Sequence, residues 1–255
     1  MQAHDIMPFT KLINVDQGAR KHFHVPTYQR EYTWKKCHWE RLLNDIKNNN
    51  PGYFMGSIIC MNDARTISAG DKLIFEVLDG HQRLTTLSLL LAAIYSKLTS
   101  AMDGYEPADE QDRKEVRSCI TNIRAKLIKH KKGARSGEAG AFKVGKNVYF
   151  LRVQPSAKNH NLADYLYLLG KAGVIESQPK QPYCGNRLLG RAYANFQEKI
   201  FVERPLAHGS RHAASRGSRL GMRDLRAFFD AGAIVGRLSR GVERLPGDAG
   251  RIVDP

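Results

Sequence analysis

Cysteine is scarce in this sequence, and its positions show no metal-binding or redox spacing. The four cysteines, Cys37, Cys60, Cys119 and Cys184, lie far apart in a chain of 255 residues. Without a C-x-x-C pair, neither a zinc ribbon nor a dithiol redox centre is predicted. The H-E-x-x-H signature of zinc hydrolases is also missing. We expect all four cysteines to be reduced residues that pack in the core.

Long apolar runs are missing too. The longest, at residues 87–94, is far shorter than the ~20 residues of a membrane-spanning helix, so no membrane segment is predicted. The amino-terminal stretch, MQAHDIMPFTKLINV, lacks the charged start and the continuous apolar stretch of a secretory signal. We therefore expect a cytoplasmic protein without a membrane partner. The hydrophobic fraction of 42% suits a globular core.

Negative charge is in short supply. The chain has 25 Asp and Glu against 40 Lys and Arg, which gives a formal net charge of +15. Basic side chains that displace condensed counterions are the main source of nucleic-acid affinity, so DNA is the expected partner. The alternative is a protein that is basic without such a partner. No Walker loop, dinucleotide-binding glycine pattern or G-x-S-x-G elbow occurs.

The order of apolar residues predicts a mixed α/β fold. Segments rich in β-branched and aromatic residues between turn formers predict strands, and apolar residues at helical spacing predict helices. The expected strands are 22–25, 53–61 and 73–78, with a hairpin at 142–153. The expected helices are 9–19, 35–48, 82–98, 109–132, 161–171 and 187–200.

Residue usage divides the chain into three stretches, 1–104, 105–200 and 201–255. The last stretch contains ten Arg and no Lys, Tyr, Asn or Gln, whereas residues 1–200 contain eighteen Lys and twelve Arg. One hypothesis is that a frameshift near Ile200 truncated the original domain and left an out-of-frame tail. The other is a natural, partly disordered Arg-rich arm that binds nucleic acid. Translation of the other frames of the gene would distinguish them.

The turn from Asp79 to Arg83 is suited to holding an anion. An apolar strand stops at Asp79-Gly80, and a helix begins at His81-Gln82-Arg83. A helix start presents backbone N–H groups without partners and the positive end of the peptide dipoles, so phosphate oxygens bind there. Arg83 adds a planar cation that can bind phosphate bidentately. Gly80 allows a close approach of the backbone to a ligand.

A structural explanation covers part of the same turn. Asp79 as N-cap and Gln82 three residues later match a capping box. Capping does not explain Arg83, because an unpaired cation is mildly unfavourable at the positive end of a helix. We therefore predict that Arg83 binds an anion. His81 is expected to be an ordinary hydrogen-bonded or exposed histidine or, beside a phosphate, a group that assists proton transfer.

The segment PTYQREYTW at 26–34 has two interpretations. It could direct Gln29 and Arg30 toward a ligand while Tyr28 and the other aromatic side chains pack or stack on a base. Alternatively, it is an edge strand whose aromatics are core and whose arginine pairs with Glu31 or Glu40.

A basic cluster ends the helix expected at 109–132. Because clustered cations suit a phosphate backbone, we take this cluster as the candidate nucleic-acid contact. Its members are Lys126, Lys129, Lys131 and Lys132.

Taken together, these motifs resemble the amino-terminal domain of GmrSD-type modification-dependent restriction enzymes. The matching segments run in order from Phe23 to Leu98, as VPTYQREYTW, Trp39, Asp45-Ile46, YFMGSII and LDGHQRLTTL. The resemblance implies a ParB-like fold for 1–104 and a helical extension of the same family domain for 105–200. It also implies a nucleotide-hydrolysing domain that controls cleavage of foreign, modified DNA in phage defence.

The resemblance assigns roles to the residues of both motifs. The family's signature positions fall on Asp79, Gly80, Gln82 and Arg83, and its first motif falls on Tyr28, Gln29 and Arg30. The implied cofactor is Mg²⁺ with a nucleoside triphosphate (NTP). Arg83 and the helix amides would hold the phosphates, with Arg30 as a second cation. Asp79 would hold Mg²⁺ or orient water.

The sequence departs from the family pattern at the turn and at its end. His81 stands where the family usually has Gln, so we expect weakened or altered activity, with Gln82 or His81 positioning the attacking water. No HNH nuclease constellation is present, so a separate HNH nuclease domain or subunit is an implied partner. The competing hypothesis is a non-catalytic DNA-binding or adaptor module of the same fold. A third is a degraded fragment without a stable fold.

Overall fold

The computed structural model describes most of the first 200 residues. The described residues are 12–13, 20–49, 53–62, 72–102, 110–130, 141–144, 146–200 and 237–238. The helix expected at 9–19 falls almost entirely outside these ranges. So do Lys131, Lys132 and all of the Arg-rich tail except its residues 237–238.

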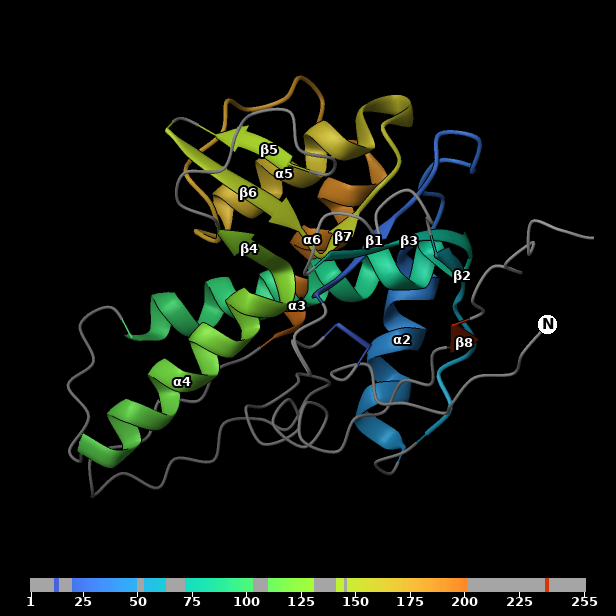
Figure 1. Cartoon of the computed structure of the whole chain (residues 1–255). Helices are drawn as coiled ribbons and strands as arrows, with labels where there is room; N and C mark the ends of the chain where they lie inside the picture. Colours follow the sequence, from blue (N-terminus) through green and yellow to red (C-terminus); the bar gives the residue numbers. More distant parts are fainter. Residues whose placement is uncertain are drawn as a thin grey trace, which may run out of the picture.

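A five-stranded mixed sheet carries the candidate motifs, with the strand order β7-β1-β3-β2-β8 (Figure 1). Its strands are β1 (Arg20–His24), β2 (Ile59–Asn62), β3 (Lys72–Asp79), β7 (Val153–Gln154) and β8 (Arg237–Leu238). β1 pairs in parallel with β3 and with β7, whereas β2 is antiparallel to β3 and parallel to β8. The predicted strands at 22–25 and 73–78 are confirmed, and the mixed α/β fold with them.

A second, three-stranded antiparallel sheet lies next to β7. It contains β4 (Ile128–His130), β5 (Ala141–Val144) and β6 (Asn147–Leu151) in the order β4-β6-β5. The hairpin predicted at 142–153 is therefore confirmed by β5 and β6. Arg152 links the two sheets, because its N–H donates to the Leu127 carbonyl at 3.0 Å and its own carbonyl accepts from the Phe23 N–H at 2.8 Å.

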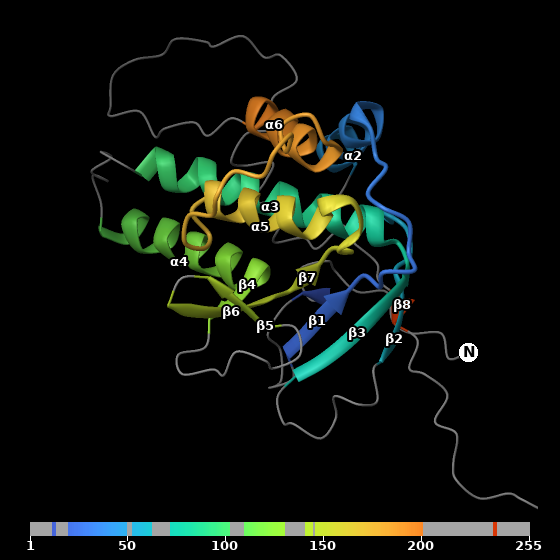
Figure 2. The same cartoon turned by 90° about the horizontal axis from the view of Figure 1, so that it is seen from above.

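Helices pack on one side of the β1–β3–β2 sheet (Figure 2). They are α2 (Lys36–Asn48), α3 (His81–Met102), α4 (Glu110–Leu127), α5 (Asn161–Lys171) and α6 (Leu188–Lys199), with a short 3₁₀ helix at Lys158–His160. The predicted helices at 35–48, 82–98, 161–171 and 187–200 are confirmed within a few residues.

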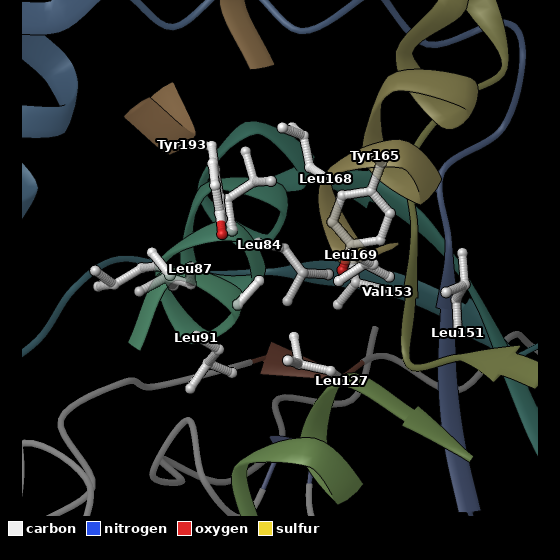
Figure 3. Close-up of a cluster of buried hydrophobic side chains, with 14 of the residues drawn as sticks. Leu84, Leu87, Leu91, Leu127, Leu151, Val153, Tyr165, Leu168, Leu169 and Tyr193 are labelled. Carbon is white, nitrogen blue, oxygen red and sulfur yellow. The ribbon is translucent and has the colours of Figure 1, made fainter. Parts of the chain in front are cut away.

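The core is built around α3, which is apolar on nearly all sides and correspondingly buried. Leu84, Leu87 and Leu91 lie among leucines and tyrosines of α5 and α6 and residues of β6 and β7 (Figure 3). In the described part of the chain, α3 alone is long and apolar enough to cross a membrane, yet 72% of its most apolar window is buried inside the protein. Burial of that kind is typical of a core helix.

Two predicted elements were wrong in their extent. The strand expected at 53–61 begins only at Ile59, because Gly56 has φ +101° and turns the backbone out of the extended conformation. The helix expected at 109–132 ends at Leu127, because the β-branched Ile128 and the residues after it pair with β6. The expectation that every cysteine packs in the core fails at Cys37, which is exposed.

The domain boundary placed at residue 104 remains a prediction. β7, from the proposed helical extension, pairs with β1 of the proposed α/β domain. The extension's α4, α5 and α6 also contact α3. The two stretches thus contribute to one hydrophobic core.

The buried ion pair between Asp164 on α5 and Arg187 before α6 provides a test of this packing. Asp164 is fully buried, and Arg187 donates to both of its carboxylate oxygens. We expect Arg187→Ala to lower the free energy of unfolding by about 3 kcal/mol, because it leaves a buried charge unpaired. The double variant Asp164→Ala/Arg187→Ala should be less destabilised than Arg187→Ala in urea denaturation. Additive effects would contradict the pairing.

Candidate functional site

The turn between β3 and α3 requires glycine at position 80. Gly80 has φ +84°, and its carbonyl accepts the first helical hydrogen bond from the Leu84 N–H at 3.0 Å. A Cβ at this position would lie 2.9 Å from the carbonyl oxygen of Ser57 and 3.1 Å from the Cα of Ile58. The close approach that we expected at Gly80 is therefore made by this chain's own backbone at 57–58.

Gln82 does not form the capping box that the sequence suggested. Its Oε1 accepts from the Thr33 N–H at 2.8 Å, and its Nε2 donates to the Glu31 carbonyl at 2.7 Å. These two backbone partners also fix which end of the amide is oxygen, because a flipped amide would mispair both. Gln82 thus joins the YQRE segment (28–31) to the first turn of α3.

A chain of hydrogen bonds holds the same two segments together in the interior. Trp39 Nε1 donates to the Tyr32 hydroxyl at 2.8 Å, and that hydroxyl lies 2.7 Å from Thr86 Oγ1. Thr86 in turn donates to the Gln82 carbonyl at 2.7 Å. Because the single hydroxyl hydrogen of Thr86 goes to the Gln82 carbonyl, Tyr32 must donate to Thr86 while it accepts from Trp39. Every member of the chain is thus satisfied. Tyr32 and Trp39 are therefore core residues.

The three residues of the YQR motif, Tyr28, Gln29 and Arg30, differ in their exposure and their contacts. Gln29 donates from Nε2 to the Leu78 carbonyl at 2.8 Å and so binds the end of β3. Tyr28 is 62% exposed, and its pKa is raised by partial desolvation and by the adjacent Glu76 carboxylate. Arg30 is exposed at the surface.

The ion pairs proposed for Arg30 do not form among the described residues. Glu40 pairs with Lys36 at 3.8 Å, and the Glu31 carboxylate accepts from the Asn159 amide. Within the described ranges neither acidic residue pairs with Arg30, whose side chain is exposed. The Asn159 contact was not predicted, because the sequence carries no signal that brings the extension to this segment.

His81 is held in its neutral form. The Gln82 amide donates to His81 Nε2 at 2.7 Å, so that nitrogen is an acceptor. Burial lowers the pKa of His81, and the positive charge of Arg30 lowers it further, against the smaller opposing effects of Asp79 and of a hydrogen bond to the Arg30 backbone. Since both ring nitrogens are engaged by protein groups, this arrangement does not favour proton transfer from water.

Arg83 lies half-buried across the backbone that leads into β2. Its Nη1 donates to the Ser57 carbonyl at 3.2 Å. A Cβ on Gly56 would come within 2.5 Å of the guanidinium, so glycine makes room for the arginine there. Burial lowers the pKa of Arg83, and the negative charge of Asp79 opposes that effect only in part. The positive charge is thus incompletely compensated by the described residues and would gain from an anion.

Asp79 is exposed at the end of β3 and is the acidic residue suggested for Mg²⁺. Within the described ranges, no cluster of three or more His, Cys, Asp or Glu side chains could hold a metal ion. Mg²⁺ in nucleotide sites is commonly bound through one or two carboxylates, several waters and the phosphates. A single exposed carboxylate therefore fits a nucleotide-borne Mg²⁺ and does not fit a metal held by the protein alone.

The two described lysines of the basic cluster lie on different elements. Lys126 is in the last turn of α4, whereas Lys129 is on β4 opposite Phe150, and both are half-buried. Lys131 and Lys132 lie outside the described residues. The nucleic-acid role of this cluster stays a prediction.

Fold and site together define a mixed α/β protein in which a glycine turn sets an arginine at the start of a buried helix. The family model for the GmrSD restriction endonuclease N-terminal domain matches residues 10–171. Because this match covers more than half of the chain, the chain belongs to that family, and the protein is a component of a restriction system. The family indicates interaction with DNA. A comparison with curated proteins gives no match.

The lowered pKa of His81 predicts a pH dependence of stability. Above the ordinary histidine pKa of about 6.5, the ring is neutral in the folded and unfolded states, and its contribution is fully present. As the pH falls below about 6.5, the unfolded state binds the proton first, so stability decreases until the lower folded pKa is passed. We expect His81→Gln to reduce the fall in Tm between about pH 7.5 and 5.5.

The exposed His160 provides the control for this measurement. His160→Asn removes a titratable ring at a position with φ 63°, which asparagine tolerates well. Its pH profile of Tm should follow the wild type. Identical profiles for His81→Gln and the wild type would contradict the neutral, buried state of His81.

Gln82 should be required for stability as well as for any activity. Gln82→Ala leaves the Thr33 N–H and the Glu31 carbonyl without their partner, so we expect a loss of about 2 kcal/mol in urea denaturation. Gln197→Ala is the matched control, because Gln197 bonds a single backbone carbonyl, that of Ala93, from α6. If Gln82 acted only by positioning a water molecule, Gln82→Ala would leave the free energy of unfolding unchanged.

Proposed function

We propose that this protein is the NTP-hydrolysing, regulatory part of a modification-dependent restriction system. The observation that supports the proposal is the state of Arg83. Its guanidinium is half-buried at the start of α3, and burial lowers its pKa. In the described part of the chain, Asp79 opposes this effect of burial only in part. A triphosphate would supply the missing negative charge.

The chain offers the phosphates a cation and oriented dipoles. Arg83 belongs to the first turn of α3, where helix N–H groups have no intrahelical partner. We therefore expect the helix start and the guanidinium to act on the same anion. Phosphoryl transfer depends mainly on positioning and on neutralising charge, which are the contributions such a site makes. Arg30 is exposed near His81 and is the candidate second cation.

The remaining signature residues take different roles in this proposal. Asp79 is the exposed carboxylate that would orient water or hold Mg²⁺ carried by the nucleotide. Bound Mg²⁺ would neutralise charge on the phosphates. Gln82 positions the turn, because its amide is hydrogen-bonded to the backbone of Glu31 and Thr33.

The wider assignment rests on the family. We assign it a role in phage defence, with a separate HNH nuclease domain or subunit as the cleaving partner. DNA would contact basic side chains that include Lys126 and Lys129. The change of residue usage after Ile200 is consistent with a truncated copy of the family domain.

A non-catalytic DNA-binding or adaptor module is the second candidate. One observation favours it. His81, at a position where the resembling family usually has Gln, has both ring nitrogens engaged by Gln82 and Arg30. A site altered in this way could bind a nucleotide without turning it over.

Hydrolysis by the purified chain with Mg²⁺ and each NTP tests the proposal. We expect Arg83→Ala to reduce kcat/KM by about 100-fold, because it removes a preorganised charge. Asp79→Ala should also reduce the rate. Arg191→Ala is the control, since Arg191 is exposed on α6, and it should keep the wild-type rate. Equal rates in all four proteins would reject hydrolysis at this site.

A further inference from the structure

Two aromatic side chains are exposed on the segment that Arg83 crosses. Residues 53–58 lead into β2 without joining the sheet. Met55 is buried and anchors the segment, whereas Phe54 is 58% exposed and Tyr53 is 38% exposed. Both aromatics fall in the strand expected at 53–61, but in the structure they precede β2. Among the described residues, the hydrogen bonds that hold the turn involve neither of them.

Phe54 is two residues from the glycine that the Arg83 guanidinium contacts. The guanidinium of Arg83 rests on Gly56 and donates to the Ser57 carbonyl. Consecutive Cα atoms are about 3.8 Å apart, so the Cα of Phe54 is within about 7.6 Å of the Cα of Gly56. In a nucleotide the base is separated from the phosphates by the ribose, which is a comparable distance.

We infer that Phe54, with Tyr53 beside it, stacks on the base of the nucleotide whose phosphates Arg83 binds. The inference rests on the proposed function and adds a second contact to the same site. Aromatic rings stack on the π-face that every base has, so the contact tolerates any base. Phe54 has no hydrogen-bonding group, and the expected ligand is therefore an NTP bound with little discrimination among the bases.

The charge beside the aromatics favours a nucleotide over an apolar protein partner. A protein surface that covered Phe54 and Tyr53 by apolar contact alone would desolvate Arg83 further and supply no negative charge. A nucleotide supplies both an aromatic face and an anion. Its base matches the aromatic rings of this segment, and its phosphates match the Arg83 guanidinium that crosses it.

Calorimetric titrations with Mg²⁺-ATP and with inorganic tripolyphosphate distinguish binding of the base from binding of the phosphates. Phe54→Ala should weaken ATP binding about tenfold, because it removes one stacking contact, and should leave tripolyphosphate binding unchanged. Phe54→Trp should restore ATP binding, whereas Phe54→Leu, which is apolar but has no π-face, should not. GTP, CTP and UTP should show the same losses as ATP.

The control removes an exposed aromatic elsewhere. Tyr183 is 77% exposed in the segment before α6 and has φ 59°, so Tyr183→Asn deletes the ring without new backbone strain. This variant should bind ATP as the wild type does. Equal Tm values for the variants and the wild type would show that the fold is unchanged.

The possible outcomes distinguish this inference from the function on which it rests. Two results would contradict the stacking contact and leave the phosphate site standing. In one, the wild type binds ATP and Phe54→Ala binds it equally well. In the other, Phe54→Ala weakens ATP binding and tripolyphosphate binding to the same extent. If the wild type binds neither ligand, the proposed function fails and the stacking contact with it. Arg83→Ala should weaken the binding of both ATP and tripolyphosphate.

Discussion

The amide of Gln82 is the interaction on which the site depends. It accepts from Thr33, donates to Glu31 and faces His81, so it connects the first turn of the central helix to the segment after β1. Gln29 reinforces the connection from the other direction through the Leu78 carbonyl. These bonds make the two sequence motifs one structural unit, although residues 29 and 82 are far apart in the chain.

The same turn explains how an arginine comes to be partly desolvated without a full counter-charge. Gly80 lets β3 turn into α3 against the backbone at 57–58, and Gly56 clears the space that the Arg83 guanidinium occupies. A side chain at either glycine would push these segments apart. The backbone therefore forces the guanidinium to be partly buried. Because α3 is fixed in the core along its length, it cannot move away to expose the guanidinium.

Periodicity predicted the helices and β1 and β3 because their apolar residues face a single core. It did not predict where β2 begins, since YFMGSIICM is as rich in strand-forming residues before Gly56 as after it. The end of α4 was missed for a related reason, because Lys129 continues a helical charge pattern and the pairing with β6 is a tertiary contact. At the site, the sequence assigned roles to Arg83 and the YQR segment but none to Gly56, Ser57 or Asn159. Their contacts depend on the path of the backbone, which no local pattern encodes.

The structure also separates what the D-G-H-Q-R motif implies about fold from what it implies about chemistry. Gly80 sets the turn, Gln82 joins two segments, and His81 is buried between them, so these residues are explained without any ligand. Asp79 and Arg83 are not, because Asp79 is exposed and the charge of Arg83 is only partly balanced by the residues that the structure describes. A chain could keep the first group for stability and lose the second without unfolding. Membership of the family therefore supports the fold of this turn more strongly than it supports hydrolysis, and the case for a nucleotide rests on Arg83.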